Sequence, residues 1–115
     1  MVEVRCECWR ERGYYDVYDN DEYVGRCIVE RMRRNGEPVY LIYNVRVLTE
    51  CRRRGYATMM LQKVINDFVN RGKVILEVYQ DNEIAIHLYK KLGFQMTEEY
   101  MHDGKPAWIM QLMTM

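Results

Sequence analysis

The 115-residue sequence predicts an α/β fold of the mixed (α+β) kind, with a mostly antiparallel sheet, a central strand–helix–strand unit and a C-terminal hairpin. Three observations lead to this prediction. The first half of the chain alternates apolar and polar residues with the period of two that strands show. After Thr49 and Glu50, apolar residues recur at helical spacing. A β-branched segment, a second helical pattern and two strand-like segments follow. One domain over residues 1–115 is expected, since this length suffices for a single core.

The N-terminal half consists of predicted strands joined by polar turns. Val2–Trp9 alternates apolar residues with charged ones. Tyr14–Tyr18 and Glu22–Met32 are rich in aromatic and β-branched residues and flank an Asp-Asn-Asp turn, a combination typical of a hairpin. Arg33–Pro38 is rich in turn-forming residues. Val39–Leu48 is almost wholly apolar or aromatic, which indicates a strand buried on both faces near the centre of the sheet.

The C-terminal half alternates predicted helices and strands. In chain order they are a helix over Ala57–Phe68, a strand over Lys73–Tyr79, a helix over Ile84–Leu92 and a hairpin of Phe94–Met101 with Pro106–Met113. Gly72 is expected to end the first helix as a C-cap glycine, and Gly93 to end the second. Asp81 or Asn82 is suitably placed to cap the N-terminus of the second helix.

Composition excludes several classes of function. Seventeen basic and seventeen acidic side chains cancel, so bulk charge does not favour nucleic-acid binding. No apolar run approaches the roughly 20 residues that span a bilayer, and the acidic, strand-like start does not resemble a secretory signal. The four cysteines are Cys6, Cys8, Cys27 and Cys51. They lack the second Cys/His pair of a zinc site, so we expect no metal, free thiols and a reducing, cytoplasmic location.

The most informative segment is the basic turn Arg52-Arg53-Arg54-Gly55-Tyr56-Ala57, where the buried strand gives way to the first helix. A helix N-terminus has unpaired N–H groups and positive partial charge. Gly55 has no Cβ, so an anion can approach the backbone, and the arginines add charge-assisted donors. The turn therefore suits a diphosphate, although a solvated basic turn remains the alternative. Its spacing matches neither a Walker loop nor the dinucleotide fingerprint.

This turn and its surroundings resemble motif A of the GNAT N-acetyltransferase superfamily, V-x-x-x-x-[RQ]-x-x-G-x-[GA] followed by an amphipathic helix, over Val47–Leu61. A second segment, Val78–Phe94, resembles the family's motif B, N-x-x-A-x-x-[LF]-Y-x-x-x-G-F. The matching residues of this second motif are Asn82, Ala85, Tyr89, Gly93 and Phe94. Two motifs in the right order and at the right spacing make the resemblance far more specific than either alone.

The resemblance implies direct acetyl transfer from acetyl-CoA, held as a cosubstrate, to an amine. By analogy, the coenzyme-binding residues are Val47, Arg52, Arg53, Arg54, Gly55, Tyr56, Ala57, Thr58, Asn82 and Tyr89. The backbone N–H of Val45 would bond the thioester oxygen, and Tyr89 would be the general acid that protonates the departing sulfur. Asn82 could instead serve only as a helix cap, and Tyr89 only as a core tyrosine.

The general base is not identified by the resemblance. Some relatives place a glutamate early on the central strand, where this sequence has Leu41. Glu50, Tyr40, Tyr43, Glu30 and ordered water remain open alternatives. Deprotonation by solvent would suffice for an amine of lowered pKa.

The N-terminal region departs from the family pattern. Relatives usually have two helices after the first strand, whereas only Arg10–Gly13 separates the first two strands here. The acceptor site is therefore expected to be open, either to a small-molecule, peptide or protein amine or to a homodimer partner. An inactive coenzyme A-binding module or accessory subunit is the alternative function. A nucleic-acid binder using the arginine triplet is a third hypothesis.

Overall fold

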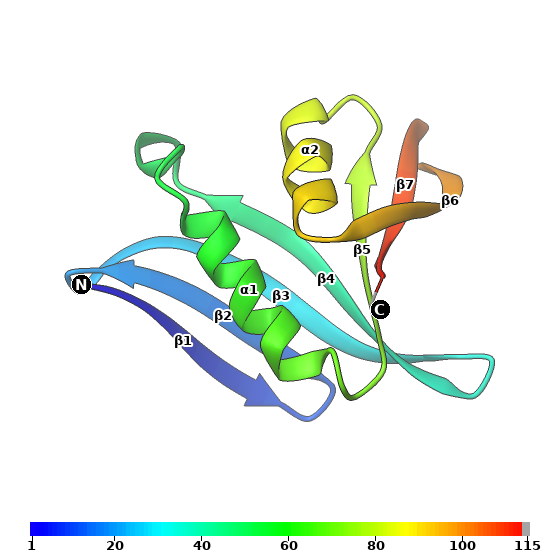
Figure 1. The fold of residues 1–115 in the computed structure, drawn as a ribbon, viewed down its shortest axis with the longest axis horizontal. Helices are drawn as coiled ribbons and strands as arrows, with labels where there is room; N and C mark the ends of the chain where they lie inside the picture. The colour runs from blue at the N-terminus through cyan, green and yellow to red at the C-terminus, as the bar shows by residue number, and fades with distance from the viewer. Residues whose placement is uncertain (114–115) are drawn as a thin grey trace.

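The computed structural model describes residues 1–113, which form a single seven-stranded sheet with helices on one face (Figure 1). The elements are β1 (Val2–Trp9), β2 (Arg12–Asp19), β3 (Glu22–Arg34), β4 (Glu37–Val47), the 3₁₀ turn η1 (Thr49–Cys51), α1 (Tyr56–Phe68), β5 (Lys73–Tyr79), α2 (Glu83–Lys91), β6 (Phe94–His102) and β7 (Lys105–Leu112). The strand order is β1-β2-β3-β4-β5-β7-β6. All neighbouring strands are antiparallel except β4 and β5.

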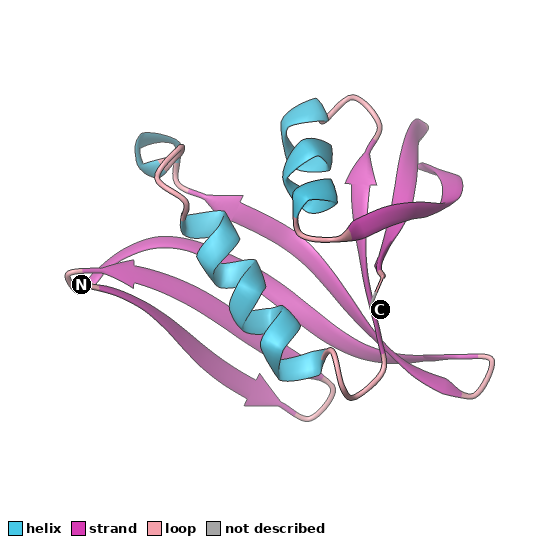
Figure 2. Cartoon of the chain, in the orientation of Figure 1, coloured by secondary structure: helices cyan, strands magenta, loops and turns pink. Residues whose placement is uncertain are grey.

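The predicted fold class is confirmed. β4, α1 and β5 form the central strand–helix–strand unit, and β6 with β7 forms the C-terminal hairpin. Figure 2 shows both helices on the same side of the sheet, with β1 and β6 as its two edges. β1 and β2 pair directly through the short turn after Trp9, so no helix intervenes between them.

The turn predicted for Arg33–Pro38 is tighter than the sequence pattern indicates. β3 extends to Arg34 and β4 begins at Glu37, which leaves Asn35 and Gly36 as the turn. Both have positive φ, 53° and 80°, as a two-residue type I′ hairpin turn requires. An asparagine–glycine pair adopts this conformation readily. The flanking residues Arg33, Arg34, Glu37 and Pro38 therefore remain in the strands.

The core lies between the sheet and the helices. Val17, Cys27, Ile42 and Leu76 point from four adjacent strands toward the helices and are fully buried. The α1 side chains that face them at helical spacing and are equally buried are Met60, Leu61 and Val64. The period-two and helical patterns of the sequence therefore meet in one apolar layer.

Gly72 does not end α1 as predicted. The helix ends at Phe68 with Val69 as its C-cap, and Gly72 does not have the positive φ of a C-cap glycine. A Cβ at Gly72 would lie 2.6 Å from the Pro38 carbonyl oxygen. The glycine is thus required because the chain passes close to β4 as it enters β5.

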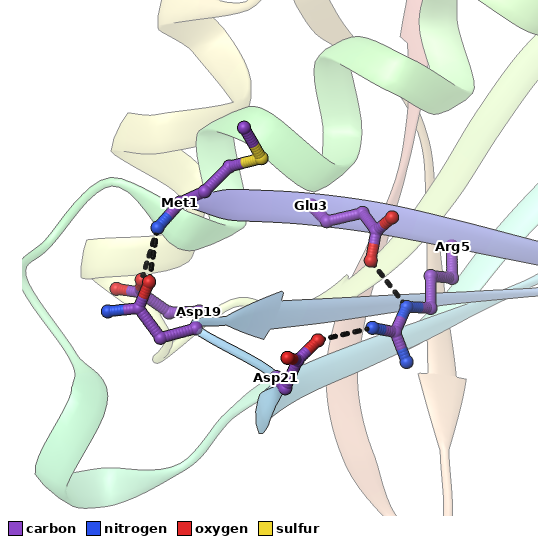
Figure 3. A network of polar contacts seen from close by, with 6 residues as sticks. Met1, Glu3, Arg5, Asp19 and Asp21 are labelled. Carbon is purple, nitrogen blue, oxygen red and sulfur yellow. Dashed lines mark hydrogen bonds and ion pairs between the residues drawn. The ribbon is translucent and has the colours of Figure 1, made fainter.

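The face of the sheet opposite the helices is charged and aromatic over β1–β3. Arg5 donates to Glu3 at 2.5 Å and to Asp21 at 3.1 Å (Figure 3). Its guanidinium lies 3.9 Å from the centre of the Tyr18 ring. Arg26 bonds Asp16 at 2.6 Å across the neighbouring strands. We call the whole face of the sheet opposite the helices the bare face. Its polar cover allows the sheet to meet water without a second helical layer.

Within residues 1–113, no helix has both the length and the apolar character needed to cross a bilayer.

Replacing Met60 with alanine tests the core. Met60 is fully buried under the sheet, so the Met60→Ala variant should lose about 2–5 kcal/mol of unfolding free energy. Its neighbour Met59 is 41% exposed, so Met59→Ala should change stability by about 0.5 kcal/mol or less. Urea unfolding followed by circular dichroism measures both. Equal losses in the two variants would contradict the packing described.

Candidate functional site

The central feature of the site is a gap in the sheet between β4 and β5. The two strands pair only over Val39–Ile42 and Lys73–Leu76. Beyond these residues β4 continues to Val47 and β5 to Tyr79 without pairing to each other, and Figure 1 shows their arrowheads well apart. The facing backbone edges are therefore available to hydrogen-bond a ligand inserted between the strands.

A β-bulge bends β4 where the gap opens. Ile28 of β3 pairs with Tyr43 and Arg26 pairs with Arg46, so Asn44 and Val45 both lie opposite a single residue, Cys27. Asn44 has a φ of 52°, in the left-handed region that asparagine tolerates better than most residues. The predicted thioester-binding residue Val45 thus lies in the bulge, which redirects the backbone locally.

The basic turn ends in an uncapped helix N-terminus. Gly55 is the N-cap of α1 with a φ of 81°, and no side chain caps the helix. The first helical bond runs from the Met59 N–H to the Gly55 carbonyl at 3.1 Å, which leaves the amides of Tyr56, Ala57 and Thr58 without helical partners. No acidic residue occupies the first turn, and a Cβ at Gly55 would meet nothing within 4 Å. The turn therefore presents donors and positive partial charge to open space.

Two side chains of the turn hold it to the sheet. Arg52 Nε donates to the Val47 carbonyl oxygen at 3.2 Å. Tyr56 buries its ring, and its hydroxyl donates to the Asp19 carboxylate, which raises the pKa of the phenol. Tyr56 can therefore offer only its backbone amide to a ligand. Arg53 and Arg54 are exposed and free to move toward an anion.

The second motif contributes a helix-capping residue, Asn82, and a buried tyrosine, Tyr89. Asn82 Oδ1 accepts a hydrogen bond from the Ala85 N–H at 3.2 Å, so the predicted helix cap is confirmed. Tyr89 is buried on the helix side of the sheet, with its ring edge against Phe94 at a centroid distance of 6.3 Å. Burial raises the pKa of Tyr89 to about 12. Its phenol therefore stays protonated at neutral pH.

A hollow of about 620 Å³ lies on the bare face where β4 and β5 diverge. Its charged and aromatic lining includes Glu30, Tyr43, Arg46, Glu77, Tyr79, Tyr100 and His102. We call it the acceptor hollow. The pKa of Tyr100 is raised, first by burial and then by its interaction with Glu77. The hollow thus combines two carboxylates with hydroxyl groups, aromatic faces and the Arg46 guanidinium. Because Arg12 already pairs with Glu30, Glu77 and the aromatic faces are the groups best suited to a cationic amine.

Glu77 also lines the hollow, although it is not among the candidate residues named from the sequence. It lies on β5 in the acceptor hollow, at the strand position that follows the last pair with β4. Its neighbours Leu76 and Val78 point to the helices, so Glu77 points to the opposite face. A single carboxylate in an otherwise β-branched and apolar strand was the available signal.

Only some of the candidate bases named from the sequence line the acceptor hollow. Tyr40 packs on Phe68 at a centroid distance of 4.5 Å on the helix side, away from the hollow. Glu50 lies in η1 and does not line it. Glu30 and Tyr43 do line it, and the Tyr43 hydroxyl is 3.5 Å from Glu30 Oε1. Arg12 holds Glu30 in an ion pair at 2.8 Å.

Among residues 1–113, no cluster of three or more metal-ligating side chains is present. All four cysteines are free thiols, as predicted. Cys6 and Cys8 share the helix-facing side of β1, with their sulfur atoms 3.2 Å apart.

Comparison with known proteins places the chain in a family. The family model described as acetyltransferase (GNAT) matches residues 1–94. An N-alpha-acetyltransferase of Sulfurisphaera tokodaii is 39% identical over 75 residues, which cover 60% of this chain and 45% of that protein. The N-alpha-acetyltransferase RimI of Mycobacterium tuberculosis is 33% identical over 102 residues, covering 85% and 64%. The chain thus spans about half the length of these curated relatives.

Solved structures share the fold at lower sequence identity. A GNAT family acetyltransferase from Elizabethkingia anophelis with acetyl-CoA bound superposes with a TM-score of 0.78 at 14% identity, covering 96% of this chain and 97% of that one. Arabidopsis thaliana Naa50 in complex with a bisubstrate analogue gives a TM-score of 0.75 at 24% identity, covering 85% and 70%. The family model, which matches most of the chain, and the two sequence motifs agree with this shared fold. The chain belongs to the GNAT acetyltransferase family.

Proposed function

We propose that the chain transfers an acetyl group from acetyl-CoA to the α-amine of a peptide or protein N-terminus. One observation supports this most directly: the gap between β4 and β5 borders the acceptor hollow, and β4 leads from the gap through η1 into the uncapped N-terminus of α1. A long cosubstrate with a diphosphate at one end and a thioester at the other would extend along such a gap.

The residues at the α1 end fit the coenzyme diphosphate. The amides of Gly55, Tyr56, Ala57 and Thr58 supply donors, and the absence of an acidic residue in the first turn of α1 leaves the positive end of the helix unopposed. Arg52, Arg53 and Arg54 add charge to this end. The unpaired edge of β4 at Val45 and Val47 would bond the pantetheine arm and the thioester oxygen. Asn82 would contact the coenzyme through its amide nitrogen, since its oxygen is used as a cap.

Glu77 and Tyr89 are assigned opposite proton transfers. Glu77 accepts a proton from the acceptor ammonium, and the nitrogen lone pair then attacks the thioester carbon. As the C–S bond breaks, the Tyr89 hydroxyl donates its proton to the sulfur. The raised pKa of Tyr89 keeps that proton available across neutral pH. Bound acetyl-CoA supplies the activated acyl group.

The peptide acceptor is supported by the relatives and by the shape of the site. Several relatives are named N-alpha-acetyltransferases, and a structural neighbour holds a bisubstrate analogue with a peptide portion. The hollow opens on the bare face, which neither α1 nor α2 covers in the part of the chain that the structure describes. Its carboxylates favour a cationic terminus. A homodimer and a cytoplasmic location stay predictions from the sequence.

Gly55→Leu should remove coenzyme binding. The leucine side chain would occupy the open space beside the α1 amides and displace the diphosphate, so the affinity for acetyl-CoA in calorimetric titration should fall at least tenfold.

Gly36→Leu is the matched control. Gly36 has nearly the same φ, 80°, and also has nothing within 4 Å of a built Cβ, but it lies in the β3–β4 turn. Each substitution should cost about 1–2 kcal/mol of stability for the left-handed conformation. Equal coenzyme affinity in both variants would contradict the assigned diphosphate site.

Tyr89→Phe should lower kcat by about 10- to 100-fold and leave acetyl-CoA affinity unchanged, because the phenol acts on the departing sulfur. The release of the coenzyme A thiol, measured with a thiol-reactive dye and a set of short peptides, gives kcat. Tyr40→Phe removes another buried tyrosine hydroxyl outside the proposed site and should leave kcat unchanged. A normal kcat in Tyr89→Phe would show that the Tyr89 hydroxyl has no catalytic role and that the residue serves only in core packing.

Glu77→Gln should reduce kcat/KM for peptides by about 100-fold at neutral pH and recover part of the loss as pH rises, because solvent then deprotonates the amine. Glu98→Gln, which alters a carboxylate paired with Arg34 at 3.2 Å on β6, should have no effect. Acetyl-CoA binding without turnover of any amine by the unaltered protein would instead support an inactive coenzyme-binding module.

A further inference from the structure

We propose that the β1–β2 hairpin forms a second binding subsite, which receives an apolar or aromatic side chain of the acceptor peptide about five or six residues from the acetylated amine. This inference rests on the proposed function, since it takes the acceptor hollow as the place where the amine reacts. It goes further by assigning a specificity-determining role to Trp9.

A second hollow, of about 490 Å³, lies beside the acceptor hollow on the bare face. It is lined by Trp9, Arg10, Glu11, Arg12, Tyr14 and Glu30. Glu30 also lines the acceptor hollow, so the two depressions are adjacent. Trp9 is 62% exposed, which is unusual for so large an apolar side chain.

The sheet register aligns these residues in one row. Trp9 pairs with Arg12, Arg12 pairs with Glu30, and Glu30 pairs with Leu41, which lines the acceptor hollow. The row crosses β1, β2, β3 and β4 and ends next to β5. Strands lie about 4.8 Å apart, so Trp9 is roughly 19 Å from β5. An extended peptide covers about 3.4 Å per residue, so a residue five or six positions beyond the acetylated one, the sixth or seventh of the peptide, would reach Trp9.

The chemistry of the row suits a peptide running across the strands. The exposed indole offers a flat apolar contact for one side chain. The Arg12–Glu30 ion pair between the two hollows, with a separation of 2.8 Å, offers charged groups to the peptide backbone. Arg10 lies exposed beside Trp9 at a φ of 45° in the turn.

A second copy of the chain is a poorer occupant of this surface. Trp9 is flanked by Arg10, Glu11 and Arg12, and the β1 edge beside it presents the charged side chains Glu3, Arg5 and Glu7. Charged edges oppose strand pairing between copies. A single exposed tryptophan is also far smaller than the apolar area of a stable dimer interface.

The test compares peptides of two, four and eight residues with the same N-terminal sequence, the longest carrying phenylalanine or glycine at residue six. With the unaltered protein, kcat/KM should be at least fivefold higher for the phenylalanine octapeptide than for the tetrapeptide, through a lower KM. Trp9→Ala should abolish this difference and keep the tetrapeptide kcat/KM. Tyr23→Ala, an exposed aromatic residue on the same face but outside both hollows, should behave like the unaltered protein.

Three results would overturn the subsite. The first is an equal kcat/KM for all peptide lengths. The second is an equal loss for short and long peptides in Trp9→Ala. The third is that the unaltered protein sediments as a dimer and the Trp9→Ala variant as a monomer, which would mean that a second copy of the chain occupies this surface. In all three the tetrapeptide is still acetylated by the unaltered protein, so the proposed function stands. Acetyl-CoA binding with no peptide acetylated would contradict both.

Discussion

The limited pairing of β4 with β5 is the constraint on which the rest of the site depends. Only four residues of each strand pair, and the remaining lengths are held by their outer neighbours: β4 by β3, and β5 by β7. The bulge opposite Cys27 bends β4 at the point where pairing ends. A gap in the middle of a sheet would ordinarily leave buried backbone groups unsatisfied. Here the gap is open to solvent and to a ligand, so those groups can bond either.

Three parts of the molecule adjoin the two strands that border this gap: the basic turn, the Glu77 side of β5, and α2. At the end of β4, η1 and the basic turn lead into the uncapped α1. Along β5, the alternation of side chains puts Glu77 on the bare face and Val78 on the helix face. α2 follows β5 directly and buries Tyr89 on the helix side. Chain connectivity therefore brings both sequence motifs to one opening.

The sequence predicted the elements well because their patterns are local. Period-two alternation, helical spacing and the Asn82 cap each depend on residues within a few positions, and the structure confirms them. Gly72 was misassigned because its requirement comes from the Pro38 carbonyl, which lies far away in sequence. Glu77 was missed for a related reason. The role proposed for it depends on where pairing with β4 stops, and pairing between β4 and β5 is a tertiary property that no single segment encodes.

The placement of Glu77 and Tyr89 gives the proposed reaction a direction across the sheet. The carboxylate lies on the bare face in a solvent-open hollow, whereas the phenol lies on the helix side with a pKa raised by burial. An amine would thus lose its proton on one side of the gap, and a thiol would gain one on the other. The two groups lie on opposite faces of the sheet, so each would approach the reacting atoms from its own side. Within residues 1–113 no helix covers the proposed amine side, and the charged, aromatic surface of β1–β3 makes that opening compatible with a stable sheet. The direct pairing of β1 with β2, which leaves no helix between them, is therefore the feature that would expose the acceptor side to a peptide.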